Sequence, residues 1–184
     1  DEGIFFSSEV EFTWEDAVVA TTVDASFCNE TEWIIHNGEK RKLEHRSQQA
    51  YLIALAPPDM LNAKTAIIHP IIWGSTIIKR CCRATLMAEA YAMTCGTESG
   101  VRIRAAVVDA RGRLDFKNWE KSAANEMGHV WLTDCDSLYE HLVSPKGSPV
   151  DNKRLQIDLQ ALRQDIWERD GQIQDVVDST CGDY

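Results

Sequence analysis

The sequence predicts an α/β domain in which helices flank a mixed five-stranded sheet. Three apolar, β-branched segments come first and are joined by loops, so they can pair antiparallel. A long amphipathic helix follows, and a short apolar strand then runs directly into another helix. Strands reached across helices can pair parallel, which gives a mixed sheet with helices packed on it.

Composition is that of an ordinary single-domain globular protein. The 184 residues are 44% hydrophobic and 26% charged, enough for one domain with a core. No apolar run approaches the ~20 residues that cross a bilayer, so we expect no membrane partner. The formal net charge of −10 argues against a general nucleic-acid coat, but not against an enzyme whose acidic site holds metal ions.

The cysteines and the first residue bear on the origin of the chain. None of the six cysteines lies in a CxxC pair, so we expect reduced thiols and an intracellular protein, cytoplasmic or nuclear. The chain shows no secretory signal and opens on Asp1 rather than Met, which suggests a fragment of a longer protein. We expect residues 1–17 to form an N-terminal arm or linker and residues 18–184 to form the domain.

The first part of the domain is predicted to hold three strands. Val18 to Asp24 is rich in β-branched residues and ends in an acid. A polar, basic loop leads from there to the second strand, Gln49 to Ala56. The third strand is predicted at Ala66 to Trp73, where Pro70 indicates a sheet edge or a bulge and Gly74 ends the strand.

The long helix is predicted from Ala84 to about Val108. Apolar residues recur there at three- and four-residue steps, although Gly96 and Gly100 weaken the middle and leave two shorter helices as an alternative. Glu89 lies near the start, between two alanines, with no basic residue three or four positions further on. A carboxylate in such apolar surroundings is either expensive or functional.

A second strand that leads into an acid lies in His129 to Leu142, HVWLTDCDSLYEHL. Asp134 follows its apolar start, and the leucine spacing beyond predicts a helix that Ser137 caps. Asp134 either caps this helix or points from the strand end into the crevice where α/β folds do chemistry. Around this segment we expect a polar linker with a short helix over residues 109–128, a Pro/Gly loop, a helix over Asp151 to Arg169 that Gly171 ends, and a last strand over Gln172 to Val177.

Three acids therefore occupy positions from which they can converge. Asp24 and Asp134 lie at strand ends, and Glu89 lies on the helix between them. Carboxylates that close repel one another strongly unless a cation lies among them. Hard oxygen ligands suit Mg²⁺ or Mn²⁺ rather than zinc. Two such ions ~3.5–4 Å apart can activate a water and stabilise the leaving oxygen of a phosphodiester.

Four blocks of sequence, in this order, resemble one known family. TVDASF fits the family's first strand. RSQQAYLIALA and IIWGSTIIKRCCRATLMAEAYAM run from a serine–glutamine-led strand to a Thr-Leu-x-Ala-Glu helix, and VWLTDCDSLYEHLVSP carries a Thr-Asp-x-x-Ser-Leu turn. VDNKRLQIDLQALRQDIW is similar to the family's Asp-Lys-Arg-x-x-Ile-Asp-Leu helix. Together they cover most of Val18 to Val177 and resemble the ribonuclease H domain of copia-type LTR retrotransposon polyproteins.

The resemblance implies an RNase H-like fold and a two-metal nuclease. Such a domain cuts the RNA strand of RNA/DNA hybrids during reverse transcription, next to the reverse transcriptase region of the polyprotein. By position, Asp24, Glu89 and Asp134 are implied as the catalytic, metal-binding carboxylates. A basic run just before the Glu89 helix is expected to bind the phosphates of the hybrid; its residues are Lys79, Arg80 and Arg83.

The chain departs from the family pattern at its C-terminal end. The pattern continues into a final helix with an Ala-Asp-x-Leu-Thr-Lys-like motif, whose aspartate completes the metal site, and no such motif precedes Tyr184. We therefore expect a C-terminally truncated domain, and the alternative is an inactive RNase H-like domain that binds nucleic acid or protein. Asp158 matches a structural acid of the family, while Asp136 either caps its helix or adds a ligand. No Gly-rich phosphate loop, HExxH or GxSxG motif supports an unrelated α/β enzyme.

Overall fold

The computed structural model describes residues 12–63, 65–144 and 150–170, and within these ranges the chain forms one four-stranded mixed sheet. Five strands were predicted; the strand expected at 172–177 lies outside the described residues, as do Gly171 and most of the expected N-terminal arm. In their order across the sheet, the strands are β3 (His69–Ile77), β2 (Glu39–Ala56), β1 (Val18–His36) and β4 (His129–Leu132).

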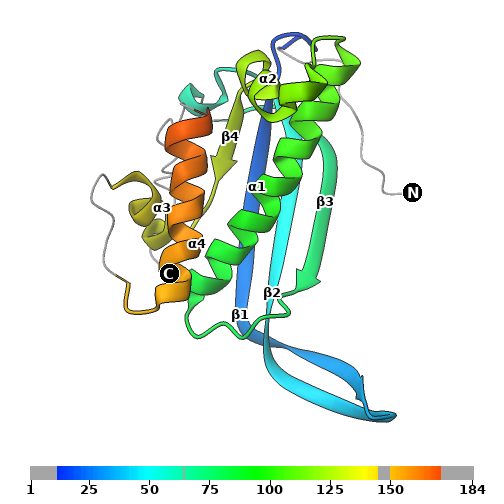
Figure 1. Cartoon of the computed structure of the whole chain (residues 1–184), viewed down its shortest axis with the longest axis vertical. Coiled ribbons are helices and arrows are strands. Elements are labelled where there is room, and N and C mark those ends of the chain that lie inside the picture. Colours follow the sequence, from blue (N-terminus) through cyan, green and yellow to red (C-terminus); the bar gives the residue numbers. More distant parts are fainter. Residues whose placement is uncertain (1–11, 64, 145–149, 171–184) are drawn as a thin grey trace.

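Helices cover one face of this sheet, with α1 and α4 lying in front of it in Figure 1. Among the described residues, no helix is both long and apolar enough to span a bilayer. The helices are α1 (Thr85–Ala110), α2 (Trp119–Glu126), α3 (Asp136–Val143) and α4 (Lys153–Gln164), with 3-10 turns at Met60–Asn62 and Phe116–Asn118 and π-helical residues Asp165–Asp170.

The strands β1 and β2 form one long antiparallel hairpin. It turns at Asn37 and Gly38, which have φ angles of 52° and 79°, as an Asn-Gly hairpin turn requires. The predicted strand end at Asp24 and the predicted loop after it were therefore wrong, because β1 and β2 continue through that region. The outer half of the hairpin projects beyond the rest of the sheet (Figure 1).

Irregular pairing marks the point where the hairpin leaves the sheet. The register between β1 and β2 shifts between Ser26 and Glu30 and again between Glu30 and Glu32. Cys28 and His45 adopt positive φ angles of 57° and 58° in the same region. Bulges of this kind bend a strand and increase its twist, so they redirect the outer hairpin away from the sheet.

The strand β3 lies at the edge of the sheet, as Pro70 predicted. Its register with β2 shifts between Ile53 and Ala54, next to the proline. The predicted strand end at Gly74 was wrong, since pairing continues to Ile77. A Cβ at Gly74 would lie 2.9 Å from the ring of Tyr51, so the glycine leaves room for a cross-strand aromatic side chain.

The strand β4 pairs parallel to β1, from Val19 with His129 to Thr22 with Leu132, which confirms the predicted mixed sheet. Three residues separate the end of β4 from the start of the helix α3. Its N-cap is Cys135, whose backbone N–H donates to the Thr133 hydroxyl, so the prediction that Ser137 caps this helix was wrong.

The helix α1 is continuous, in place of the two shorter helices that its glycines left open. A Cβ at Gly96 would lie 2.5 Å from Val23, and a Cβ at Gly100 would lie 2.5 Å from both Thr21 and His129. The glycines therefore let α1 approach β1 closely, which offsets their low helix propensity. The core on this side joins α1 to α3 and α4; its members include Met93, Leu138, Leu159, Leu162 and Ile166.

Candidate metal centre

Three carboxylates from three elements meet at one end of the sheet. Asp24 of β1, Glu89 of α1 and Asp134 of the β4–α3 loop each offer an oxygen, and these oxygens all lie within 4.8 Å of one another. The structure thus brings together the three acids that the sequence singled out. Three acidic side chains this close together could hold a metal ion, and no other such group of acidic, histidine or cysteine side chains occurs among the described residues.

Two parallel neighbouring strands position the two aspartates. Thr22 of β1 pairs with Leu132 of β4, and each aspartate lies two residues further along its own strand direction. Because side chains alternate with a period of two, Asp24 lies on the same side of β1 as Thr22, whereas Asp134 lies in the bend that follows β4. Asp134 follows the end of β4 as predicted, whereas Asp24 lies inside β1, beyond the part that pairs with β4.

The helix α1 brings the third carboxylate to this end of the sheet. Glu89 lies in its second turn, where the neighbouring Ala88 and Ala90 are fully buried. The side chain of Glu89 is itself only 5% exposed, whereas Asp24 and Asp134 are exposed. The site therefore has one buried oxygen donor and two donors that a ligand can reach from solvent.

The buried carboxylate is electrostatically strained. Burial raises the pKa of Glu89 to about 7, and the negative charges of Asp134 and Asp24 act in the same direction. A hydrogen bond from the Ala25 backbone amide opposes the shift in this pKa. The Glu89 Oε2 atom has no hydrogen-bond partner. An unpaired buried oxygen beside two further carboxylates fits a divalent cation, whose charge would offset the repulsion.

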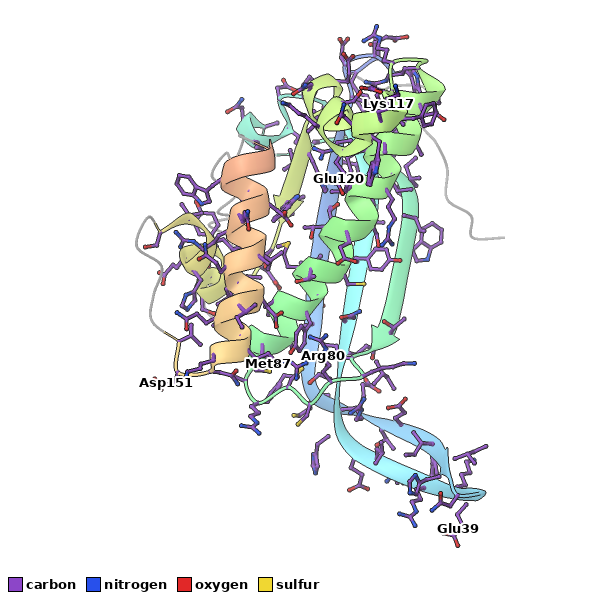
Figure 2. The ribbon with its side chains drawn as sticks, viewed as in Figure 1. Glu39, Arg80, Met87, Lys117, Glu120 and Asp151 are labelled. Atoms are coloured by element: carbon purple, nitrogen blue, oxygen red, sulfur yellow. The ribbon has the colours of Figure 1, made fainter. Side chains whose placement is uncertain are left out.

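The basic residues that were expected to bind phosphates lie between β3 and α1. Lys79, Arg80 and Arg83 are all exposed. The guanidinium of Arg80 lies over the ring of Tyr91, 5.3 Å from its centroid, and Tyr91 is two residues after Glu89 on α1. Figure 2 shows Arg80 near the end of the sheet from which the hairpin projects. The three side chains are accessible from solvent, and their contact with nucleic acid stays a prediction.

A buried polar chain, which the sequence did not reveal, ties β4 to β1. Burial, followed by the charge of Arg104, lowers the pKa of His129 to about 3, so the imidazole is neutral. Trp131 Nε1 donates to His129 Nδ1 over 3.2 Å, which leaves the ring proton on Nε2 to donate to the Thr21 hydroxyl over 2.8 Å. These hydrogen bonds hold β4 beside β1, and so help to fix the positions of Asp24 and Asp134. Its only sequence signal was a histidine at the start of an apolar strand.

The other acids considered from the sequence lie outside the cluster. Asp136 is an exposed residue in the first turn of α3, where a negative charge favours the helix dipole. Asp158 lies half-buried on α4. The five cysteines in the described ranges are free thiols. His69, at the start of β3, contacts the ring of Phe12 edge to face at 5.5 Å.

No family model and no curated protein sequence matches the chain. A solved structure described as the foamy viral protease-reverse transcriptase in complex with RNA/DNA hybrid is similar over 92% of the chain, at 13% sequence identity and a TM-score of 0.37. The chain spans about a fifth of that protein's length, since the match covers 19% of it. A likeness this distant assigns neither a family nor an activity to the chain.

Proposed function

We propose that the chain is an RNase H-type nuclease module of a copia-type retrotransposon polyprotein, which uses two Mg²⁺ or Mn²⁺ ions to cut the RNA strand of RNA/DNA hybrids. The observation that carries this proposal is the convergence of Asp24, Glu89 and Asp134 within 4.8 Å. They come from the first strand, from the helix that follows the third strand and from the end of a strand parallel to the first, and they are the three residues that the sequence resemblance implied. The adjoining reverse transcriptase region is the expected neighbour in the polyprotein.

The three carboxylates have different proposed roles because their surroundings differ. Asp24 and Asp134, exposed and on neighbouring strands, would hold the first ion most directly, and Glu89 would help to hold the second ion near the scissile phosphate. When bound, a pair of divalent ions ~3.5–4 Å apart supplies an activated water and stabilises the leaving oxygen. The exposed aspartates leave the site open to a phosphodiester from solvent.

Glu89 also links the site to protons. With a pKa of about 7, it holds a proton for much of the time at neutral pH in the metal-free protein. Ligands must be deprotonated to bind a metal ion, so loading the site requires this proton to leave. Phosphate contacts from Lys79, Arg80 and Arg83 would hold the hybrid beside the carboxylates.

Cleavage of a labelled RNA/DNA hybrid in Mg²⁺ or Mn²⁺ tests the proposal. Asp134→Asn should lower the cleavage rate at least ~100-fold while hybrid binding is kept, because it removes a charged metal ligand. Asp136→Asn, two residues away and outside the cluster, is the matched control and should cleave at nearly the unmodified rate. Equal rates for Asp134→Asn and the unmodified chain would rule out the proposed site.

An inactive RNase H-like domain that binds nucleic acid or protein is the second candidate. It is favoured by the net charge of −10. This candidate predicts no metal-dependent cleavage by the unmodified chain, with binding to hybrid or to a protein partner unaffected by Asp134→Asn.

A further inference from the structure

The outer part of the β1–β2 hairpin, residues 30–46, forms an arm that projects from the sheet. Figure 2 shows Glu39 at its tip, far from the helices that cover the sheet. Large apolar side chains are exposed on the arm, since Ile35 is 80% exposed and Trp33 is 57% exposed. Exposed apolar side chains that gather on one element mark an interaction site more often than singly scattered ones do.

The side chains on one face of the arm are partly buried or paired, whereas those on the other face are exposed. On one face, Ile34 and Leu43 are half-buried, and Arg46 forms a salt bridge of 3.1 Å with Glu32. The other face is open. It consists of two cross-strand pairs, Trp33 with Lys42 and Ile35 with Lys40.

The open face combines an aromatic ring with positive charge. Lys40 Nζ lies 4.8 Å from the centroid of the Trp33 ring, a cation–π arrangement. No carboxylate of the described residues forms a salt bridge with Lys40, whereas Lys42 is paired with Glu44 at 2.7 Å. That pair is exposed, so it contributes little and gives way readily to another anion.

We propose that this face, Trp33, Ile35, Lys40 and Lys42, is a second contact for nucleic acid, which binds the hybrid some distance from the carboxylates. The identity of the occupant rests on the proposed function. An exposed aromatic ring with a lysine over it suits a base or sugar stacked beside a phosphate. A two-stranded ribbon also fits the wide, shallow minor groove of an A-like duplex, where shape and the 2′-hydroxyl are read.

A protein partner fits this surface less well than a nucleic acid does. Four side chains on a two-stranded ribbon offer far less than the ~800 Å² that each partner buries in a stable protein interface. Phosphates also complement the lysine charge in a chain whose net charge is −10. The arm is continuous with the proposed site, because β1 carries both Asp24 and Trp33.

The geometry sets the length of hybrid that can use this contact. Trp33 lies nine residues beyond Asp24 on β1, which sets an upper limit of roughly 30 Å on their separation at ~3.3 Å per residue, because the strand bends between Ser26 and Glu32. At ~3.4 Å per base-pair step, this distance corresponds to roughly nine base pairs. A hybrid of about six base pairs over the carboxylates therefore cannot reach the Trp33 face, whereas one of about twenty base pairs can.

The test compares hybrid binding by the whole chain with two double variants. Trp33→Ala with Lys40→Ala removes the ring and the free charge of the open face. Phe116→Ala with Lys117→Ala is the matched control, since it removes an exposed aromatic residue and an exposed lysine at the opposite end of the sheet (Figure 2). We expect the first variant to bind a twenty-base-pair hybrid about tenfold more weakly, from lost stacking and a lost phosphate contact, with no change for a six-base-pair hybrid. The control should bind both hybrids as the unmodified chain does.

A conservative double variant and the metal-dependent cleavage assay complete the test. Trp33→Phe with Lys40→Arg keeps a ring and a cation and should retain the affinity for the long hybrid, whereas equal weakening in this variant would overturn the proposal. Unchanged binding of the long hybrid by the alanine variant would overturn it too, and would favour a protein partner for the arm. If the unmodified chain shows no metal-dependent cleavage but the alanine variant still weakens long-hybrid binding, the nuclease proposal fails and the nucleic-acid contact stands.

Discussion

At the scale of single residues, Glu89 links the stability of the protein to its proposed activity. The folded state raises the pKa of this carboxyl from 4.5 to about 7, so it binds a proton that the unfolded chain has already released over this range. The contribution of Glu89 to the free energy of unfolding therefore falls as pH rises from about 4.5 to 7, by roughly 3 kcal/mol for a shift of this size. His129 acts in the opposite direction, since burial lowers its pKa to about 3 and its contribution rises up to about pH 6.5.

Comparison with Glu89→Gln separates these two effects. Without metal ions, the variant should gain stability relative to the unmodified chain as pH rises from 4.5 to 7.5, by up to about 3 kcal/mol, because the amide does not ionise. Urea unfolding at several pH values in the presence of a chelator measures this difference. Glu98→Gln, exposed on the same helix, should show no such trend. A difference between Glu89→Gln and the unmodified chain that stays constant with pH would contradict the assigned burial.

The sequence singles out the three acids, which lie close together in the structure, because their neighbours are informative. Glu89 stood out between alanines without a basic partner, and Asp134 stood out because an apolar strand ran into it. Asp24 was found although its strand end was misplaced, since the sequence of β1 does not show where pairing with β4 stops. The link from Trp131 through His129 to Thr21 was not predictable, because it depends on which strands become neighbours.

At the scale of elements, the fit of α1 on β1 depends on Gly100. Gly100→Ala should destabilise the protein by about 1–3 kcal/mol, because the new Cβ would lie 2.5 Å from both Thr21 and His129 and α1 would have to move. Helix propensity alone predicts a gain of about 1 kcal/mol, so the sign of the measured change decides between packing and propensity. Chemical unfolding gives this value. Glu98→Ala, at an exposed position of the same helix, is the control, and its free energy of unfolding should stay within about 0.5 kcal/mol of that of the unmodified chain. A stabilised Gly100→Ala variant would mean that α1 and β1 are not in close contact.

The helix α1 was predicted correctly as one helix, whereas the outer part of the β1–β2 hairpin was not predicted. The period of α1 was clear, but only its contact with β1 explains why two glycines do not divide it. The Asn37-Gly38 pair is the strongest local signal for a hairpin, although the residues around it are mostly charged and polar. The outer part of the hairpin has exposed apolar residues on one face and half-buried ones on the other, so its sequence lacks the strict apolar and polar alternation of a half-buried strand.

At the scale of the whole molecule, the proposed metal site joins three elements that lie far apart in the sequence. A cation held between β1, α1 and the β4–α3 loop binds the folded state only, so it should stabilise the fold by mass action. At 100 times the dissociation constant of one site, the free energy of unfolding should rise by about 2.7 kcal/mol. Apparent affinity should also increase from pH 6 to pH 8, because Glu89 must lose its proton before it can act as a ligand.

Unfolding midpoints measured across a Mn²⁺ or Mg²⁺ titration test this coupling independently of any cleavage. Asp24→Asn and Asp134→Asn should each remove most of the metal-dependent gain, since each deletes one of the two exposed ligands. Asp136→Asn should keep it, which separates a specific site from general screening of a chain with a net charge of −10. If all three variants gain stability as the unmodified chain does, the ions act on the overall charge and the three carboxylates do not form a metal site. If only the first two lose the gain, the acid cluster is a functional feature of the fold, whether or not the module cuts RNA.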